Sequence, residues 1–200
     1  MALTPVAATG IPADLEAAER AYRAFMIALG LDADHPTIVD TPRRVAQAGL
    51  DLFSGLHGDP VRALGGGEPI EGVYPGPVVV RDIPYSSVCE HHMLPFKGVV
   101  SVAYLPDRML AGIGDFDAMI RVLAARPQMQ ERLADQIAQT VVDTIGARGV
   151  LVVLSAEQAC MWARGERTVG SEAYSVSSRG VYDTDPVQRA EARSLIGLHG

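Results

Sequence analysis

Apolar residues recur at helical spacing near the start of the chain and predict a first helix. Leu15, Tyr22, Met26 and Leu29 share one face of this helix, and Gly30 follows as its natural end. A face of this kind is apolar enough to pack against a neighbouring element. We therefore expect the chain to begin with an amphipathic helix.

A second helix is predicted to begin where Thr41 precedes Pro42. Threonine is a common N-cap residue, and proline fits the first helical turn because it needs no amide donor there. Val45, Leu50 and Phe53 then mark the apolar face. We expect residues 1–75 to form a helical region with a linker.

Short apolar runs later in the chain predict strands, separated by two helical segments. The strands are expected at 78–80, 99–104, 150–154 and 171–178, and a closing helix at 186–198. The second of the two central helices is predicted to start near Pro127 and to end at Gly149. Strands, two helices and further strands, with the helices on one side, form an α+β fold over 76–200.

Composition narrows the possible partners. The 200 residues suit one well-packed domain with a helical extension. A net charge of -7 argues against nucleic acid and anionic membranes, which attract basic patches. No secretory signal is visible, and no apolar run approaches the roughly 20 residues of a membrane helix. We expect a cytoplasmic protein with reduced cysteines and no membrane partner.

The strongest candidate chemistry lies in the run Cys89, Glu90, His91 and His92, together with the distant Cys160. Cys89 and His92 are three residues apart, so a helical turn or a tight loop can aim both at one point. Thiolate and imidazole are ligands that zinc prefers. The alternative is a pair of buried thiols or a disulfide.

This run and its surroundings resemble the GTP cyclohydrolase I family, from about Ala18 to about Leu198. The resemblance implies a Zn²⁺ ion held by Cys89, His92 and Cys160, with water in the fourth position. In the family this water adds to C8 of guanine, the imidazole ring opens, and formate leaves before a dihydropterin ring closes. His91 matches the family's proton-handling histidine, although it could instead only donate a hydrogen bond to a neighbour.

The resemblance also implies an architecture and an assembly. Family members have the T-fold, in which strands from several subunits join into a barrel and remove exposed sheet edges. They form homo-oligomeric rings, usually stacked into decamers, with active sites where subunits meet. We therefore expect a small-molecule purine substrate bound by residues from more than one copy.

Substrate-binding residues follow from matching stretches of the family. Glu131, with Gln130 beside it, matches the carboxylate that accepts hydrogen bonds from N1–H and the 2-amino group of guanine. Arg44 and Arg164 match phosphate-binding arginines. The alternatives are a solvated helix charge for Glu131 and surface ion-pairing for the two arginines.

Several positions depart from the family. Gly114, Asp115 and Ala118 stand where the family has a serine, a lysine and an arginine at the triphosphate. A carboxylate there repels phosphate instead of attracting it. Gln158 replaces a catalytic histidine, and glutamine cannot transfer a proton near neutral pH.

Three hypotheses account for this pattern of matches and departures. The first is a zinc hydrolase that opens a phosphate-poor guanine or oxidised guanine and can stop before a pterin forms. The second is GTP cyclohydrolase I activity with a rebuilt phosphate pocket. The third is a non-catalytic ligand-binding or regulatory paralogue, which has no need of an open metal position.

Overall fold

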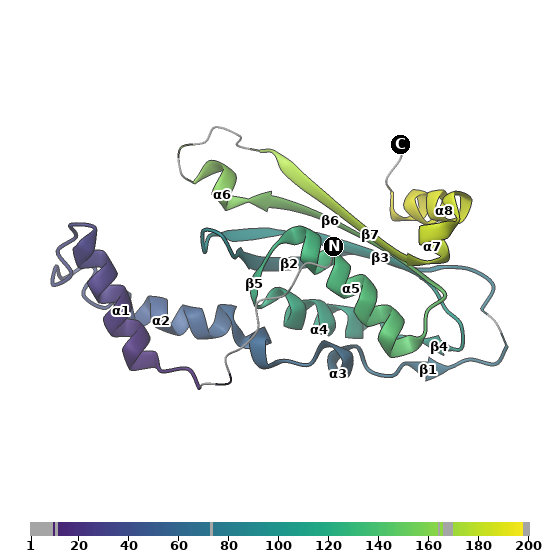
Figure 1. The fold of residues 1–200 in the computed structure, drawn as a ribbon, viewed down its shortest axis with the longest axis horizontal. Helices are drawn as coiled ribbons and strands as arrows, with labels where there is room; N and C mark the ends of the chain where they lie inside the picture. The colour runs from purple at the N-terminus through teal and green to yellow at the C-terminus, as the bar shows by residue number, and fades with distance from the viewer. Residues whose placement is uncertain (1–9, 11, 73, 164, 166–169, 198–200) are drawn as a thin grey trace.

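The computed structural model describes residues 10, 12–72, 74–163, 165 and 170–197. Its elements in chain order are α1 (Leu15–Ala28), α2 (Thr41–Leu52), η1 (Ser54–His57), α3 (Pro60–Leu64), β1 (Glu68–Pro69), β2 (Val78–Cys89), β3 (Pro95–Leu105), β4 (Met109–Leu110), α4 (Ile113–Ala124), β5 (Pro127–Gln128), α5 (Gln130–Ile145), β6 (Gly149–Gln158), α6 (Ala159–Trp162), β7 (Glu172–Gly180), α7 (Val181–Thr184) and α8 (Pro186–Ile196). This mixture of helices with one large sheet confirms the expected α+β class (Figure 1).

The main sheet has the strand order β5-β2-β3-β6-β7. Its four long strands pair antiparallel, and the two-residue β5 pairs parallel with the end of β2. Strand β2 is much longer than the predicted 78–80 run. The apolar run stops at a register shift between Val80 and Ile83, where Asp82 has a φ of 57°, and the strand continues beyond this bulge.

Helices α4 and α5 cover one face of the sheet and form the main core with it (Figure 1). Leu133, Ile137 and Val141 of α5 are fully buried there, as their spacing predicts. The predicted helix end at Gly149 is wrong. The helix ends at Ile145 because Gly146 takes a left-handed cap conformation with φ 63°, and Gly149 begins β6.

The opposite face of the sheet is covered at one end only. Leu151 and Val153 of β6 point to this face and pack with Tyr182 of α7 and with Ala192 and Ile196 of α8. Figure 1 shows α7 and α8 at the end of the molecule opposite to α6. The sheet therefore has a fully covered face and a partly open one.

Helices α1 and α2 pack against each other and extend from the end of the molecule that carries α6 (Figure 1). Asp14 caps α1 by accepting a hydrogen bond from the Ala17 amide at 2.9 Å. The N-cap of α2 is Asp40 rather than the predicted Thr41, which is the first helical residue. No helix in the described ranges is long and apolar enough to cross a bilayer.

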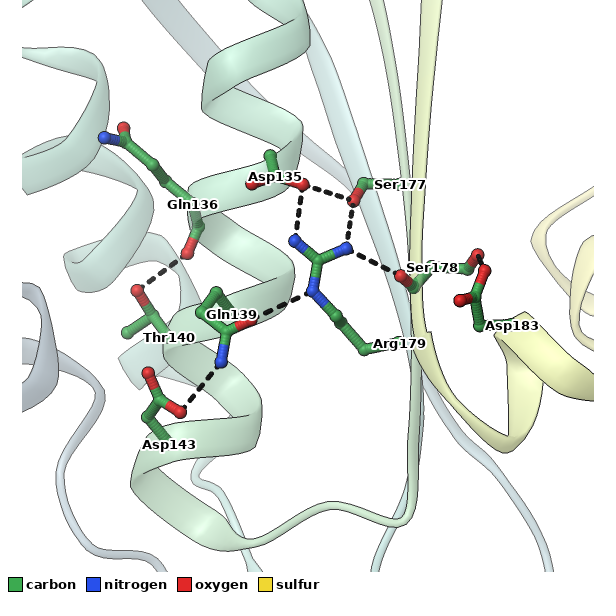
Figure 2. Close-up of polar contacts among 9 residues, drawn as sticks. All are labelled: Asp135, Gln136, Gln139, Thr140, Asp143, Ser177, Ser178, Arg179 and Asp183. Atoms are coloured by element: carbon green, nitrogen blue, oxygen red, sulfur yellow. Dashed lines mark hydrogen bonds and ion pairs between the residues drawn. The ribbon is translucent and has the colours of Figure 1, made fainter. Parts of the chain in front are cut away.

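Polar contacts fasten the edge strand β7 to α5 (Figure 2). Arg179 of β7 donates to Asp135 and, at 2.9 Å, to the side-chain oxygen of Gln139. It also donates to Ser177 Oγ and to the main-chain oxygen of Ser178. Because one guanidinium contacts both α5 and its own strand, it fixes the position of β7 against the helix.

Candidate metal centre

Cys89, His92 and Cys160 converge at one end of the sheet. Cys89 is the last residue of β2, His92 lies in the turn that follows, and Cys160 lies in the short helix α6 after β6. One ligand atom from each lies within 4.8 Å of the other two, which makes the only such metal-compatible group in the part of the chain that the structure describes. Neither cysteine forms a disulfide, so that alternative is excluded.

A tight turn brings His92 back toward Cys89. The Cys89 amide donates to the Leu94 oxygen at 2.8 Å, and the Met93 amide donates to the Cys89 oxygen at 2.9 Å. Met93 has a φ of 53°, an uncommon conformation for a residue with a side chain. The turn is thus held by main-chain hydrogen bonds on both sides of the histidine.

The three donors fit a zinc ion. Two thiolates and one imidazole suit its preference for sulfur and nitrogen, and three protein ligands leave one tetrahedral position for water or substrate. Cys89 is buried, Cys160 is half-buried and His92 is exposed. A metal held by this group would therefore be reachable from solvent on the His92 side.

His91 lies beside this group and is largely exposed. Its Nδ1 is 3.9 Å from the Cys89 sulfur, and its Nε2 is 3.9 Å from a carboxylate oxygen of Glu90. This imidazole is open to solvent and lies next to the three possible metal ligands.

Glu90 forms a two-pronged ion pair with Arg132 of α5, at 2.5 and 3.0 Å. The Arg132 side chain is only 6% exposed and that of Glu90 18%. Hydrogen bonds from Arg132 lower the pKa of the Glu90 carboxyl, and burial opposes that shift. The Glu90 amide also donates to the Gln128 oxygen, so the turn with both histidines is fixed to β5 and α5.

Gln158 and Gln130 form a second polar contact near the metal ligands. The Gln158 amide nitrogen donates to the side-chain oxygen of Gln130 at 2.7 Å. Gln130 in turn donates to the main-chain oxygens of Leu154 and Ala173. Gln130 is only 3% exposed, so the structure places it within the protein rather than on the surface of the site.

Glu131 is exposed in the first turn of α5, where the helix dipole favours a carboxylate. Tyr85 of β2 is buried nearby, and its hydroxyl has no hydrogen-bond partner among the described residues. Burial, followed by the Glu131 charge, raises the pKa of this hydroxyl. Sequence reasoning missed Tyr85 and Arg132 because a single tyrosine in a strand or arginine on a helix carries no motif.

The remaining predicted site residues are not brought to this centre. Gly114, Asp115 and Ala118 belong to the first half of α4. The other end of α4 is the one near the metal ligands, because Ser87 of β2 donates to the Ala124 oxygen at 2.7 Å. The helical rise places Asp115 about 14 Å along the axis from that end.

The structure describes one of the two predicted phosphate-binding arginines. Arg44 is exposed on α2, where it lies 3.6 Å from Asp40 in an ion pair one helical turn apart. Arg164 lies outside the described residues.

Comparison with known proteins identifies the family. A model of the GTP cyclohydrolase I family matches residues 18–197. The GTP cyclohydrolase 1 of Leifsonia xyli subsp. xyli is 46% identical over 179 residues, covering 90% of this chain and 93% of that protein. The GTP cyclohydrolase 1 of Dehalococcoides mccartyi is 40% identical over 189 residues, covering 94% of this chain and 99% of that protein.

A solved structure of the archaeosine synthase QueF-Like in the apo form overlaps with 54% of this chain and 96% of its own, at 21% identity and a TM-score of 0.41. That overlap is too limited to support an argument. The family match and the two curated relatives span nearly the whole chain, and the α+β sheet is that of the T-fold. The chain therefore belongs to the GTP cyclohydrolase I family.

Proposed function

We propose that this protein hydrolytically opens the imidazole ring of a guanine-type purine at C8. The observation that carries the proposal is the convergence of Cys89, His92 and Cys160, whose ligand atoms lie within 4.8 Å of one another. A zinc ion bound there supplies Lewis acidity that lowers the pKa of a coordinated water to about 7. Membership of the GTP cyclohydrolase I family supports a guanine compound as the substrate.

Residues around the centre divide the remaining tasks. His91, exposed and close to Cys89, moves protons between solvent and the opening ring. Glu131 accepts the parallel N1–H and 2-amino donors of guanine, and a base without both donors leaves the carboxylate poorly paired. Glu90 and Arg132 hold the turn that carries the two histidines.

The substrate in this proposal carries fewer phosphates than GTP, or none. Asp115 lies in the first turn of α4, and its carboxylate folds over Gly112 at the helix N-terminus. A helix N-terminus attracts anions, and here a carboxylate of the protein occupies that place. Guanosine, guanine and an oxidised guanine such as 8-oxoguanine are therefore the preferred compounds, and the reaction can end at hydrolysis without forming a pterin.

GTP itself is the second candidate substrate. The 46% identical relative from Leifsonia xyli is named GTP cyclohydrolase 1, which favours the same reaction here with other cations at the phosphates. Arg44 and Arg164 are candidates for that contact, supplied by the same or a neighbouring copy. Formation of dihydroneopterin triphosphate would identify this activity.

Mass spectrometry of reaction products tests both candidates. The zinc-loaded protein is incubated in parallel with GTP, GMP, guanosine, guanine and 8-oxoguanine. We expect turnover of a phosphate-poor compound, and the product mass shows where the reaction ends. A strong preference for GTP would contradict the phosphate-poor assignment, and no turnover of any compound would contradict the ring-opening proposal.

Replacing Asp115 with lysine restores a cation at the start of α4. We expect the KM for GTP to fall about tenfold, because the substitution exchanges repulsion for attraction beside a polyanion. The KM for guanosine should not change. Asp51→Lys makes the same charge change on α2 and should leave both constants unchanged. Equal effects of Asp115→Lys on the two substrates would show that Asp115 lies away from the phosphates.

We also propose that the active site is completed by assembly into a homo-oligomeric ring. Asp115 lies about 14 Å along α4 from the helix end that is near the chain's own metal ligands, and in this proposal it faces a substrate held by another copy. The strand β7 is an open sheet edge, with Tyr174 60% and Val176 55% exposed on it. Pairing with a strand of a second copy removes this edge.

The α1–α2 pair supplies a second surface for assembly. A groove of about 710 Å³ between the two helices is lined mainly by apolar side chains, including Tyr22, Phe25, Val45 and Leu50. Phe25 is 55% exposed, and an exposed cluster of large apolar side chains often marks an interaction surface. We propose that the same helices of a second copy pack into this groove when the ring forms.

Charge placed in this groove should weaken the assembly. We expect Leu50→Asp to raise the dissociation constant between copies at least about tenfold, because a carboxylate is costly to bury without a partner. Sedimentation velocity measures the change. Gln47→Asp, on an exposed position of the same helix, is the matched control and should assemble normally. Normal assembly of Leu50→Asp would place the interface elsewhere.

A further inference from the structure

The side chain of Gln130 has both of its polar groups engaged inside the protein. Its amide nitrogen donates to the main-chain oxygen of Ala173 at 2.8 Å and to that of Leu154 at 3.3 Å. Its oxygen accepts the amide of Gln158 at 2.7 Å. With 3% exposure, little of Gln130 remains for a substrate.

The orientation of the two side-chain amides in this contact is fixed. Main-chain oxygens only accept hydrogen bonds, so the nitrogen of Gln130 must face Leu154 and Ala173. The oxygen of Gln130 then faces Gln158. Gln158 must donate from its own nitrogen, because two amide oxygens would repel each other. The orientation of both amides is therefore set by the hydrogen-bond network itself.

Gln158 is placed where its orientation matters. It is the last residue of β6, two positions before the ligand Cys160. It pairs in register with Phe96 of β3, whose side chain is buried in the core between the sheet and α4–α5. Cys89 and Cys160 also contact this core. Gln158 and both cysteine ligands thus share one face of the sheet.

We propose that Gln130 is a positioning residue that fixes the amide of Gln158, so that its oxygen and its remaining N–H face a purine at the metal centre. The proposal rests on the ring-opening function above. Glutamine does not change protonation near neutral pH, so position 158 acts as an oriented hydrogen-bond group and not as a proton carrier. Such an amide pairs with N7 of guanine through its N–H and with N7–H of an 8-oxopurine through its oxygen.

The proposal differs from a direct contact between Gln130 and the base, which the sequence suggests. A residue that acts only through Gln158 should show no additional effect once Gln158 is gone. A residue that contacts the base independently should multiply its effect with that of Gln158. The two cases are separated by a double-mutant cycle.

The test uses Gln130→Met, Gln158→Met and the double variant of the full-length, zinc-loaded protein. We expect each single variant to lower kcat/KM about tenfold or more, as loss of positioning groups near a metal typically does. The double variant should be no slower than the slower single one. Gln47→Met removes the same kind of side chain from an exposed position of α2, outside the metal centre, and should retain normal turnover. Multiplying effects would overturn the proposal.

Two further measurements test the inference independently of the double-mutant cycle. Crystal structures of the wild type and Gln130→Met show the position of the Gln158 side chain directly, whether or not the protein turns over any purine. We expect Gln158 to leave its wild-type position, and an unchanged Gln158 would overturn the inference.

Gln158→Glu leaves Gln130 in place, and its carboxylate is repelled by the Gln130 oxygen. It should be as slow as Gln158→Met, and wild-type turnover would contradict the fixed polarity. Inactivity of the wild type toward every guanine compound would instead contradict the proposed function alone.

Discussion

His92→Ala should purify without zinc and should open no purine ring. The substitution removes the only nitrogen donor of the three-residue group, and two thiolates alone cannot hold the ion in an open tetrahedral site. Without the Lewis acid, water is not ionised at neutral pH. A loss of several kcal/mol of transition-state stabilisation corresponds to a rate reduction of roughly a thousandfold or more. Metal content by mass spectrometry and turnover of the preferred purine check the two parts separately.

The matched control is His57→Ala. His57 is an exposed histidine of η1, outside the metal group, so its loss should change neither zinc content nor rate. Retention of zinc by His92→Ala would mean that the ion is held elsewhere. Retention of activity without zinc would contradict the proposed metal chemistry.

Arg132→Leu should destabilise the fold by about 3 kcal/mol, because it leaves the Glu90 carboxylate partly buried without its two donors. Removing one partner of a buried ion pair lowers the free energy of unfolding by more than the intact pair contributes to it, because the remaining charge is poorly solvated. Urea unfolding of the metal-free protein measures the change. We expect turnover to fall as well, because the pair holds the turn that carries His91 and His92.

Arg121→Leu is the control for this substitution. Arg121 pairs with Asp117 one turn away on α4, with their side chains 74% and 40% exposed. An exposed pair of this kind contributes about 0.5 kcal/mol. A similar loss of stability in both arginine variants would show that the Glu90 pair has no special place in the fold.

The Glu90 pair also predicts how stability depends on pH. Hydrogen bonds from Arg132 hold the pKa of the folded-state Glu90 carboxyl below that of an ordinary glutamate. The contribution of the pair is therefore complete above the unfolded pKa and is lost as pH falls through the lower, folded value. The wild type should lose more stability than Arg132→Leu on acidification below about pH 4. Parallel stability curves for the two proteins would contradict this assignment.

Periodicity predicted the elements of the core well because core packing imposes it. The buried side chains of α5 recur at the spacing of one helix face, and the buried strand at 150–154 lies within β6. Boundaries were less well predicted, since they depend on single conformations. The bulge at Asp82 hides the continuity of β2, and the left-handed Gly146 ends α5 before Gly149.

The metal group was predicted because Cys89, His92 and Cys160 match the family's metal ligands, whereas their spacing alone left a pair of buried thiols or a disulfide open. Its supporting contacts were not, since arginine and glutamine acquire meaning only from what the fold places beside them. Arg132 reaches Glu90, and Gln130 reaches Gln158, across large separations in sequence. No local pattern indicates such pairs, and the family resemblance named Gln130 and Gln158 without the contact between them.

The positions of the three ligands also set an order on folding. Cys89 and His92 follow β2, whereas Cys160 follows β6, and β3 lies between these two strands in the sheet. The ligands can meet only after β2, β3 and β6 have paired, and closing such long loops is slow and entropically costly. A small zinc module can use its ion to nucleate folding, because its ligands are close in sequence. Here a newly synthesised chain must pair β2, β3 and β6 before it can retain a metal, so metal capture follows the formation of the central strands.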